Sequence, residues 1–200
     1  MPGAVVEAGD RLSLRTLEAE DLPFVRRAFA DPEIRYPMGN PVRGGDAVES
    51  WFETLVDGDD ETHFLVCRDD DGAGPGVVDE SETVRLGAVS LSGLTWRRPE
   101  LAYWLVPEHR GAGYGREAVA LAVGFAFATE PTPAVGASAY AGNDASRGLL
   151  ESLGFVQEGR MRRRRFVDGE YRDAVTYGLL REEWGDADVD VGGVLDRPDR

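Results

Sequence analysis

A glycine-rich segment in the middle of the chain has the composition of an anion-binding loop. It reads RGAGYG over residues 110–115 and runs directly into an apolar stretch of helical length. Backbone N–H groups at a helix N-terminus are unpaired, and the helix dipole places about half a positive charge there. Gly111, Gly113 and Gly115 let a phosphate approach the backbone with no Cβ in the way. The segment therefore predicts that an anionic group binds at the start of this helix.

The spacing of these glycines excludes two common phosphate-binding motifs. A dinucleotide fingerprint requires G-x-G-x-x-G, whereas the three glycines alternate here. A P-loop requires a Lys followed by Ser or Thr, and the loop has neither. A tight turn with no ligand would also fit the glycines. Three glycines beside Arg110 exceed what a turn requires, so we favour a binding loop.

The elements around the loop predict a mixed sheet. Residues 100–106 form a predicted strand that ends at Pro107, and the helix over 114–127 is apolar nearly all round, which predicts burial. Further strands are predicted over residues 11–17, 62–68, 84–94, 135–140, 155–166 and 170–180, and further helices over 21–30, 46–56 and 143–153. Residues 31–45, rich in Pro and Gly, predict a loop. Strands and helices do not strictly alternate, so the expected class is α/β of the α+β type, with helices on both faces of a mixed sheet.

Length and composition predict a single domain. We expect a lead-in over residues 1–10, the domain over 11–184 and an acidic, poorly ordered tail over 185–200, with an acidic loop at 69–82. No stretch has the pattern of a signal peptide or a membrane span, which makes the cytoplasm the expected location. The single Cys67 excludes an internal disulfide, and no residue pattern predicts a metal site.

The charge of the chain is strongly one-sided. The net charge is −15, and all 22 basic residues are arginine. An acidic, lysine-free surface stays hydrated when salt screens charges, which predicts a salt-tolerant, halophilic protein. A GC-rich genome would explain the same bias toward arginine. This charge argues against nucleic-acid binding. The basic run Arg162–Arg165 alternates between the two sides of a strand, which favours an exposed hairpin or contact with an acidic acceptor.

The glycine-rich loop and its companions resemble a known superfamily. Residues 110–115 match the R/Q-x-x-G-x-G/A loop of the GNAT acetyltransferases. The segments RLSLRTLEAEDL, ELAYWLVP, NDAS, LGF and DGEYRDAVTYGLLREEW follow in the expected order over about residues 10–184. Together they resemble the branch that contains the ribosomal-protein N-terminal acetyltransferases.

This resemblance implies a fold and a cofactor site. The fold would have about seven mixed strands and about four helices, and the fourth and fifth strands would splay apart to admit acetyl-CoA as co-substrate. No metal is implied. The implied cofactor-binding residues are Leu105, Val106, Arg110, Gly111, Ala112, Gly113, Tyr114, Gly115, Arg116, Asn143 and Ser146. Asn143 fits equally well as a plain helix N-cap.

The resemblance also implies catalytic roles. Glu100 would accept the proton of the amine, directly or through a water, and the backbone N–H of Val106 would stabilise the oxyanion. Many members carry a proton-donating Tyr where this chain has Leu150. Ser146 is the expected substitute, with Tyr140 as a fallback. Tyr103 or Trp104 would line the acceptor side.

We therefore predict acetyl transfer from acetyl-CoA to a primary amine by direct attack in a ternary complex. The resembling branch favours a protein N-terminal α-amino group as acceptor. Two other functions stay open: acetylation of a small-molecule amine or antibiotic, and acyl-CoA binding by a regulatory domain without catalysis. The sequence leaves open whether the protein is a monomer or a homodimer, and predicts neither a nucleic-acid nor a membrane partner.

Overall fold

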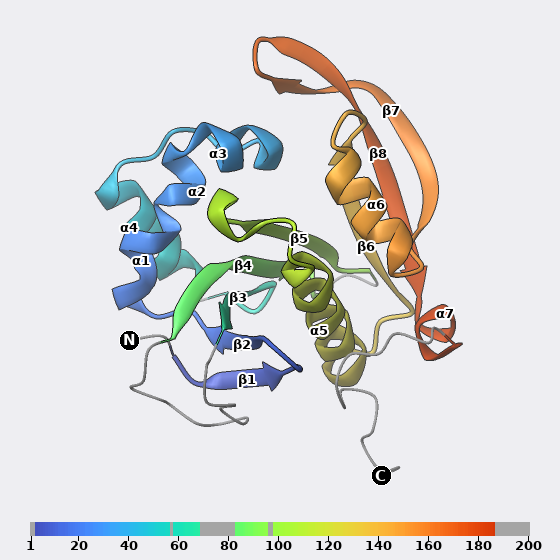
Figure 1. The fold of residues 1–200 in the computed structure, drawn as a ribbon, viewed down its shortest axis with the longest axis horizontal. Helices are drawn as coiled ribbons and strands as arrows, with labels where there is room; N and C mark the ends of the chain where they lie inside the picture. The colour runs from blue at the N-terminus through green and yellow to red at the C-terminus, as the bar shows by residue number, and fades with distance from the viewer. Residues whose placement is uncertain (1–2, 57, 69–82, 96–97, 187–200) are drawn as a thin grey trace.

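One mixed sheet runs through the molecule. A computed structural model describes residues 3–56, 58–68, 83–95 and 98–186 of the 200-residue chain. Within these ranges the sheet has eight strands in the order β1-β2-β3-β4-β5-β6-β8-β7 (Figure 1). The strands are β1 (Val5–Ala8), β2 (Ser13–Thr16), β3 (Glu61–Arg68), β4 (Val84–Ser92), β5 (Glu100–Leu105), β6 (Ala134–Tyr140), β7 (Val156–Val167) and β8 (Glu170–Leu180). Neighbouring strands pair antiparallel except β5 and β6, which are parallel.

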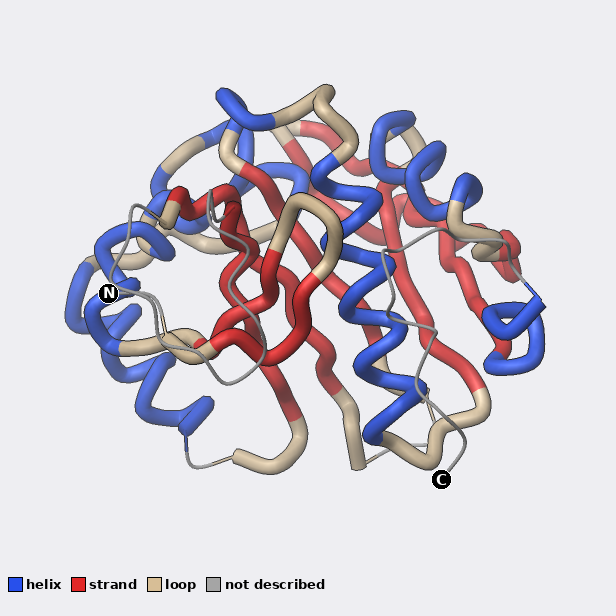
Figure 2. The backbone as a smooth tube through the Cα atoms, turned by 60° about the horizontal axis from the view of Figure 1, so that its bottom comes forward, coloured by secondary structure: helices blue, strands red, loops and turns tan. Residues whose placement is uncertain are grey.

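Helices cover both faces of this sheet, as expected (Figure 2). One face carries α1 (Leu22–Val25), α2 (Arg27–Ala30), α3 (Pro32–Met38) and α4 (Gly45–Val56). The other carries α5 (Tyr114–Thr129) and α6 (Asp144–Ser152), and α7 (Arg181–Asp186) follows β8. Side chains alternate between the two cores along the strands: Phe64 and Val66 face α5, whereas Leu65 and Cys67 face the α1–α4 layer.

The sheet is interrupted between β5 and β6. Only two residue pairs join them, Glu100 with Gly136 and Leu101 with Ala137, before the strands part. β5 remains paired with β4 as far as Leu105, and β6 remains paired with β8 over its whole length. The expected splay of the fourth and fifth predicted strands is therefore present, between the strands labelled β5 and β6 (Figure 1).

Two expectations about the N-terminal third are wrong. Val5–Ala8, expected to belong to a loose lead-in, forms β1 on the edge of the sheet. Residues 32–38, expected to be a loop, form α3. Asp31 caps this helix by accepting a hydrogen bond from the N–H of Glu33 at 2.9 Å, and Pro32 occupies the first helical position. The Asp-Pro pair thus starts a helix as well as ending the one before it.

The acidic segments predicted from the sequence lie mostly outside the described residues. The expected loop at 69–82 lies outside the described residues, and so do residues 187–200 of the expected tail. Residues 185 and 186, expected to belong to that tail, are the last two of α7. Among the described helices, none is long and apolar enough to cross a membrane.

Candidate active site

A cavity of about 440 Å³ fills the gap where β5 and β6 part. Its walls come from β5, β6, β7, α3, α6, the loop before α5 and the first turn of α5. Eight of the predicted site residues line it: Leu105, Arg110, Gly111, Gly113, Gly115, Arg116, Asn143 and Ser146. Val106, Ala112, Tyr114 and Glu100 do not line it. The structure thus gathers most of the predicted cofactor residues around one hollow.

The glycine-rich loop has the geometry of an anion cradle. Gly111 and Gly113 have φ angles of 82° and 83°, in the left-handed region where only glycine is unstrained. Gly113 is the N-cap of α5, and the N–H groups of Gly113, Tyr114 and Gly115 find no acceptor among the described residues. A Cβ on Gly115 would approach the Leu149 side chain to 3.0 Å. The loop therefore presents free amides at the positive end of a 16-residue helix.

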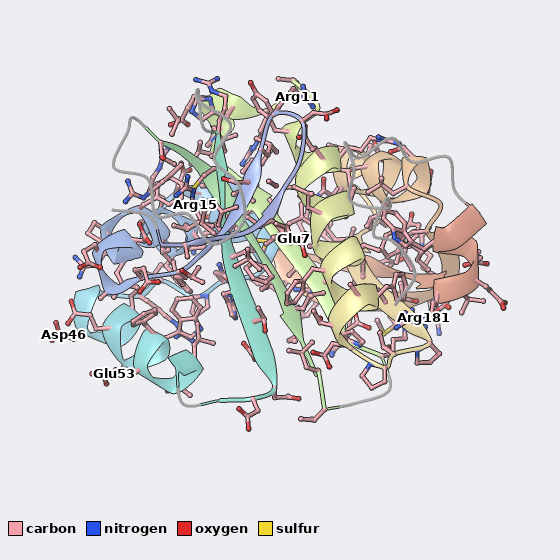
Figure 3. All side chains as sticks on the ribbon, turned by 90° about the horizontal axis from the view of Figure 1, so that it is seen from below. Glu7, Arg11, Arg15, Asp46, Glu53 and Arg181 are labelled. Carbon is pink, nitrogen blue, oxygen red and sulfur yellow. The ribbon has the colours of Figure 1, made fainter. Side chains whose placement is uncertain are left out.

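Two arginines secure the two ends of α5. Arg11, in the turn between β1 and β2, pairs with Glu117 at 2.8 Å and donates to the carbonyl of Ala112 at 2.9 Å. Figure 3 shows Arg11 near the start of α5 and Arg181 near its end, where Arg181 donates to the carbonyls of Glu130 and Thr132. The start of α5 is thus tied to the turn between β1 and β2, and the segment that follows its end is tied to the first residue of α7.

The two arginines that flank the loop differ in their partners. Arg110 turns away from the helix, because its guanidinium donates to the carbonyls of Leu105 and Glu33 at 3.0 and 3.2 Å. Arg116 lines the cavity, and its guanidinium has no hydrogen bond or ion pair with any described residue. Of the two, Arg116 is the guanidinium available to an anion, and Arg110 braces the loop against the end of β5.

The amide of Val106, predicted to stabilise the oxyanion, is already hydrogen-bonded within the sheet. The N–H of Val106 donates to the carbonyl of Leu86 at 2.9 Å, and the pairing of β4 with β5 has no bulge, so this amide is already used. Because successive amides of a strand point in opposite directions, those of Tyr103 and Leu105 point toward β6. The ladder with β6 ends at Leu101, which leaves these two amides without an acceptor among the described residues. Tyr103 and Leu105, rather than Val106, therefore have free amides that face the gap.

Ser146 is paired with a tyrosine that the sequence did not single out as catalytic. The hydroxyl oxygens of Tyr103 and Ser146 lie 2.8 Å apart across the cavity wall. Burial raises the pKa of Tyr103 to about 12, although the hydrogen bond to Ser146 acts in the opposite direction. Asn143 caps α6 by accepting from the N–H of Ser146 at 3.2 Å, so the expected cap role is confirmed while the residue also lines the cavity. Tyr140, the fallback acid, does not line the cavity.

Glu100 lies in a second cleft on the α3 side of the sheet. This cleft, of about 490 Å³, shares Ser138 and Arg165 with the first cavity. The residue is exposed overall, but its carboxylate packs against Gly136, where an added Cβ would clash with it. Desolvation raises the pKa of Glu100, the Arg98 guanidinium lowers it, and the Glu158 carboxylate raises it further.

Three groups of site residues escaped prediction. Tyr103 was expected only as a wall residue, and its pairing with Ser146 requires α6 to pack against β5. Ile34 and Met38 line the cavity from α3, a helix whose Asp-Pro start signal also fits the end of the preceding helix. Arg165 reaches both hollows from β7, and the arginine run that contains it was the available signal.

Comparisons with known proteins agree with this geometry. Residues 11–156 match the family model of the acetyltransferase (GNAT) domain. YdaF of Bacillus subtilis, provisionally named a ribosomal N-acetyltransferase, is 35% identical over 100 residues, which span 49% of this chain and 55% of YdaF. The spermidine N(1)-acetyltransferase of Vibrio cholerae is 24% identical over 177 residues, 87% of this chain and 95% of that protein.

Solved structures give the same architecture. The Vibrio cholerae spermidine N-acetyltransferase in complex with CoA and spermine superimposes with a TM-score of 0.77 at 22% identity, over 87% of this chain and 98% of that one. At this identity the likeness concerns the fold.

Proposed function

The chain belongs to the GNAT acetyltransferase family, whose members use acetyl-CoA, and we propose that the acceptor of its acetyl group is the α-amino group of a polypeptide. The observation that supports this proposal most strongly is that two cavities adjoin each other. The cavity between β5 and β6 shares Ser138 and Arg165 with the cleft that holds Glu100. That cleft is lined by exposed side chains, among them Met161 and Phe166, so it is open to a chain that extends into solvent.

The residues of the first cavity fit acetyl-CoA. The free amides at Gly113, Tyr114 and Gly115, with Arg116, would hold its pyrophosphate. The gap past Leu101 is where its arm would run beside the unpaired edge of β5. Bound there, acetyl-CoA supplies the activated acetyl group. The amide of Leu105 would donate to the negative charge that develops on the carbonyl oxygen.

Two side chains would carry out the proton transfers. Glu100 would take a proton from the attacking amine, and its raised pKa makes it a better base than an ordinary glutamate. Ser146 would give a proton to the departing thiolate, with Tyr103 hydrogen-bonded behind it. Glu100 lines the cleft and Ser146 lines the cavity, so the two groups would act on the substrates from different hollows.

A small polyamine is the second candidate acceptor. It is favoured by the family relatives that are spermidine acetyltransferases, two of which are 24% and 25% identical to this chain. Two further candidate functions are acetylation of an antibiotic amine and acyl-CoA binding without catalysis. The first predicts turnover with an antibiotic amine, and the second predicts acetyl-CoA binding with no turnover.

A thiol-release assay with acetyl-CoA tests the proposal. Purified enzyme would be offered free peptides, the same peptides with an acetylated N-terminus, spermidine and an aminoglycoside. We expect release with the free peptides, none with the blocked peptides, and a mass increase of one acetyl group on the first residue. Release with spermidine alone, or with the aminoglycoside alone, would replace the peptide by that amine as acceptor. Tight acetyl-CoA binding without release for any acceptor would favour a binding module.

The setting proposed for the enzyme follows from composition. An acidic, lysine-free chain with a single, buried cysteine fits a reducing, salt-rich cytoplasm. Monomer and homodimer are both compatible with this proposal.

A further inference from the structure

We infer that the acceptor carries carboxylates within a few residues of its amino group, and that Arg164 and Arg165 of β7 bind them. This inference rests on the proposed function and specifies its substrate class. It concerns the basic run at residues 162–165, to which the proposed pyrophosphate contacts and proton transfers assign no role.

A bulge in β7 sets the position of these arginines. Met161 pairs with Ala174 and Arg165 pairs with Arg172, so four steps along β7 match two steps along β8. Two extra residues are therefore accommodated between Met161 and Arg165. Arg163, in the middle, has a φ of 51°, which non-glycine residues rarely adopt. Bulges of this kind re-aim side chains and occur next to active sites.

Asp173 of β8 anchors the bulge. One of its carboxylate oxygens accepts from the N–H of Arg163 at 2.9 Å, and the other accepts from the side chain of Arg160 at 2.8 Å. These bonds offset the backbone strain at Arg163. A hairpin that only displayed solvated arginines would need neither a left-handed residue nor a carboxylate to hold it.

The anchored bulge leaves two arginines unpaired beside the catalytic cleft. Arg160 is neutralised by Asp173, and Arg172 pairs with Glu170 at 2.9 Å. Within the described part of the chain, Arg164 and Arg165 form no ion pair, and both line the cleft. Arg165 also donates to the carbonyl of Met38 at 3.5 Å, which directs it toward α3.

The charge of this cleft selects between acceptor classes. Its described lining contains two guanidinium groups and one carboxylate, that of Glu100. The net charge of the whole chain is −15, so a positive cleft is a local exception. A polyamine would bring its second and third cations beside these arginines, whereas a carboxylate would receive charge-assisted hydrogen bonds from them. Because an extended chain advances about 3.5 Å per residue, acidic side chains at positions two to four of a peptide reach along the cleft.

The test compares three peptides that share a first residue and carry Glu, Gln or Lys at positions two to four. With the wild-type enzyme we expect kcat/KM for the Glu peptide to exceed that for the Lys peptide by roughly tenfold or more, about 1.4 kcal/mol per tenfold step. The double variant Arg164→Glu, Arg165→Glu should reverse the order. Arg162→Gln, a neighbouring exposed arginine that does not line the cleft, should keep it.

Two further measurements separate this inference from loss of structure. The KM for acetyl-CoA should be unchanged in the single variant Arg164→Glu, because Arg164 lines the cleft but not the cofactor cavity. Asp173→Ala should raise the KM for the Glu peptide more than it lowers kcat, because the bulge loses its anchor. Equal kcat/KM for all three peptides would overturn the inference and leave peptide acetylation standing. Turnover of spermidine with no turnover of any peptide would overturn the proposed function and this inference together.

Discussion

Tyr103 and Ser146 form a hydrogen-bonded pair, and the protonation state of Tyr103 bears on the proton-donor role proposed for Ser146. With a pKa of about 12, Tyr103 stays protonated across the working range of pH. Its hydroxyl can donate to the Ser146 oxygen 2.8 Å away. The serine hydroxyl is then free to donate onward into the cavity, which is what a departing thiolate requires. Leu150, buried at the position where many family members carry Tyr, cannot take this part.

Removing either hydroxyl should slow the reaction without loosening the cofactor. We expect Ser146→Ala to lower kcat by roughly 10²-fold, the usual size of a general-acid contribution. Tyr103→Phe should lower it by less, because Ser146 keeps its own proton. KM for acetyl-CoA should change little in both. Tyr140→Phe is the matched control, since Tyr140 lies outside the cavity lining, and should behave as wild type. An unchanged rate in Ser146→Ala would assign the proton transfer to solvent or to Tyr140, and an unchanged rate in Tyr140→Phe as well would leave solvent.

The neighbours of Glu100 allow its role as base to be tested by pH. A base must be deprotonated, so activity is lost as pH falls through its pKa, which desolvation places above the ordinary value. Arg98 lowers this pKa and Glu158 raises it. Arg98→Gln should therefore move the acid limb of kcat/KM to higher pH, and Glu158→Gln should move it to lower pH. The acceptor amine titrates identically in all three enzymes, so coincident acid limbs would show that Glu100 is not the titrating group.

At the scale of elements, α5 and its loop were predictable because local sequence determines them. Alternating glycines followed by a continuous apolar run specify the loop and the buried helix with no knowledge of their neighbours. The β7–β8 hairpin was likewise readable from Asp168-Gly169, where both residues have positive φ. Five of the eight predicted cofactor residues that line the cavity, Arg110, Gly111, Gly113, Gly115 and Arg116, belong to the glycine-rich loop and the start of α5.

The elements that were missed depend on tertiary partners or on ambiguous local signals. The Asp31-Pro32 pair is compatible with either end of a helix, and only the capping bond to Glu33 decides between them. β1 has four residues and is stabilised by its pairing with β2. The direction of the Val106 amide depends on the register of β4 against β5. The bulge in β7 depends on Asp173, ten residues away from the Arg163 amide.

Gly113 offers a test of the loop as a unit. Gly113→Ala places a Cβ on a residue with φ of 83° and beside the free amides, so we expect a higher KM for acetyl-CoA and a destabilisation of about 1 kcal/mol from backbone strain. Gly148→Ala is the matched control. Gly148 is exposed within α6, and an added Cβ there meets nothing within 4 Å. Gly148→Ala should have the wild-type KM for acetyl-CoA and should be slightly more stable, because Ala has a higher helix propensity than Gly. Equal KM values for acetyl-CoA in the two variants would contradict the proposal that the loop binds acetyl-CoA.

For the whole molecule, the distribution of charge predicts a response to salt. Mutual repulsion within a chain of net charge −15 opposes the compact state, and salt screens it. We expect the melting temperature and the activity to rise with KCl up to roughly 1 M, where the screening length is about 3 Å. Sucrose, which stabilises without screening charges, serves as the control. Maximal activity below roughly 0.2 M KCl would contradict salt adaptation.

The parting of β5 and β6 also sets a limit on how this protein can evolve. A continuous ladder past Leu101 and Ala137 would make the sheet more stable, but it would use the amides of Tyr103 and Leu105 that face the gap. The junction of the sheet with the fewest residue pairs is therefore the place where we propose that substrates bind. We expect selection to reject substitutions that strengthen this junction. Stabilising substitutions should therefore accumulate elsewhere, for example around Arg181, which donates to the carbonyls of Glu130 and Thr132 after α5.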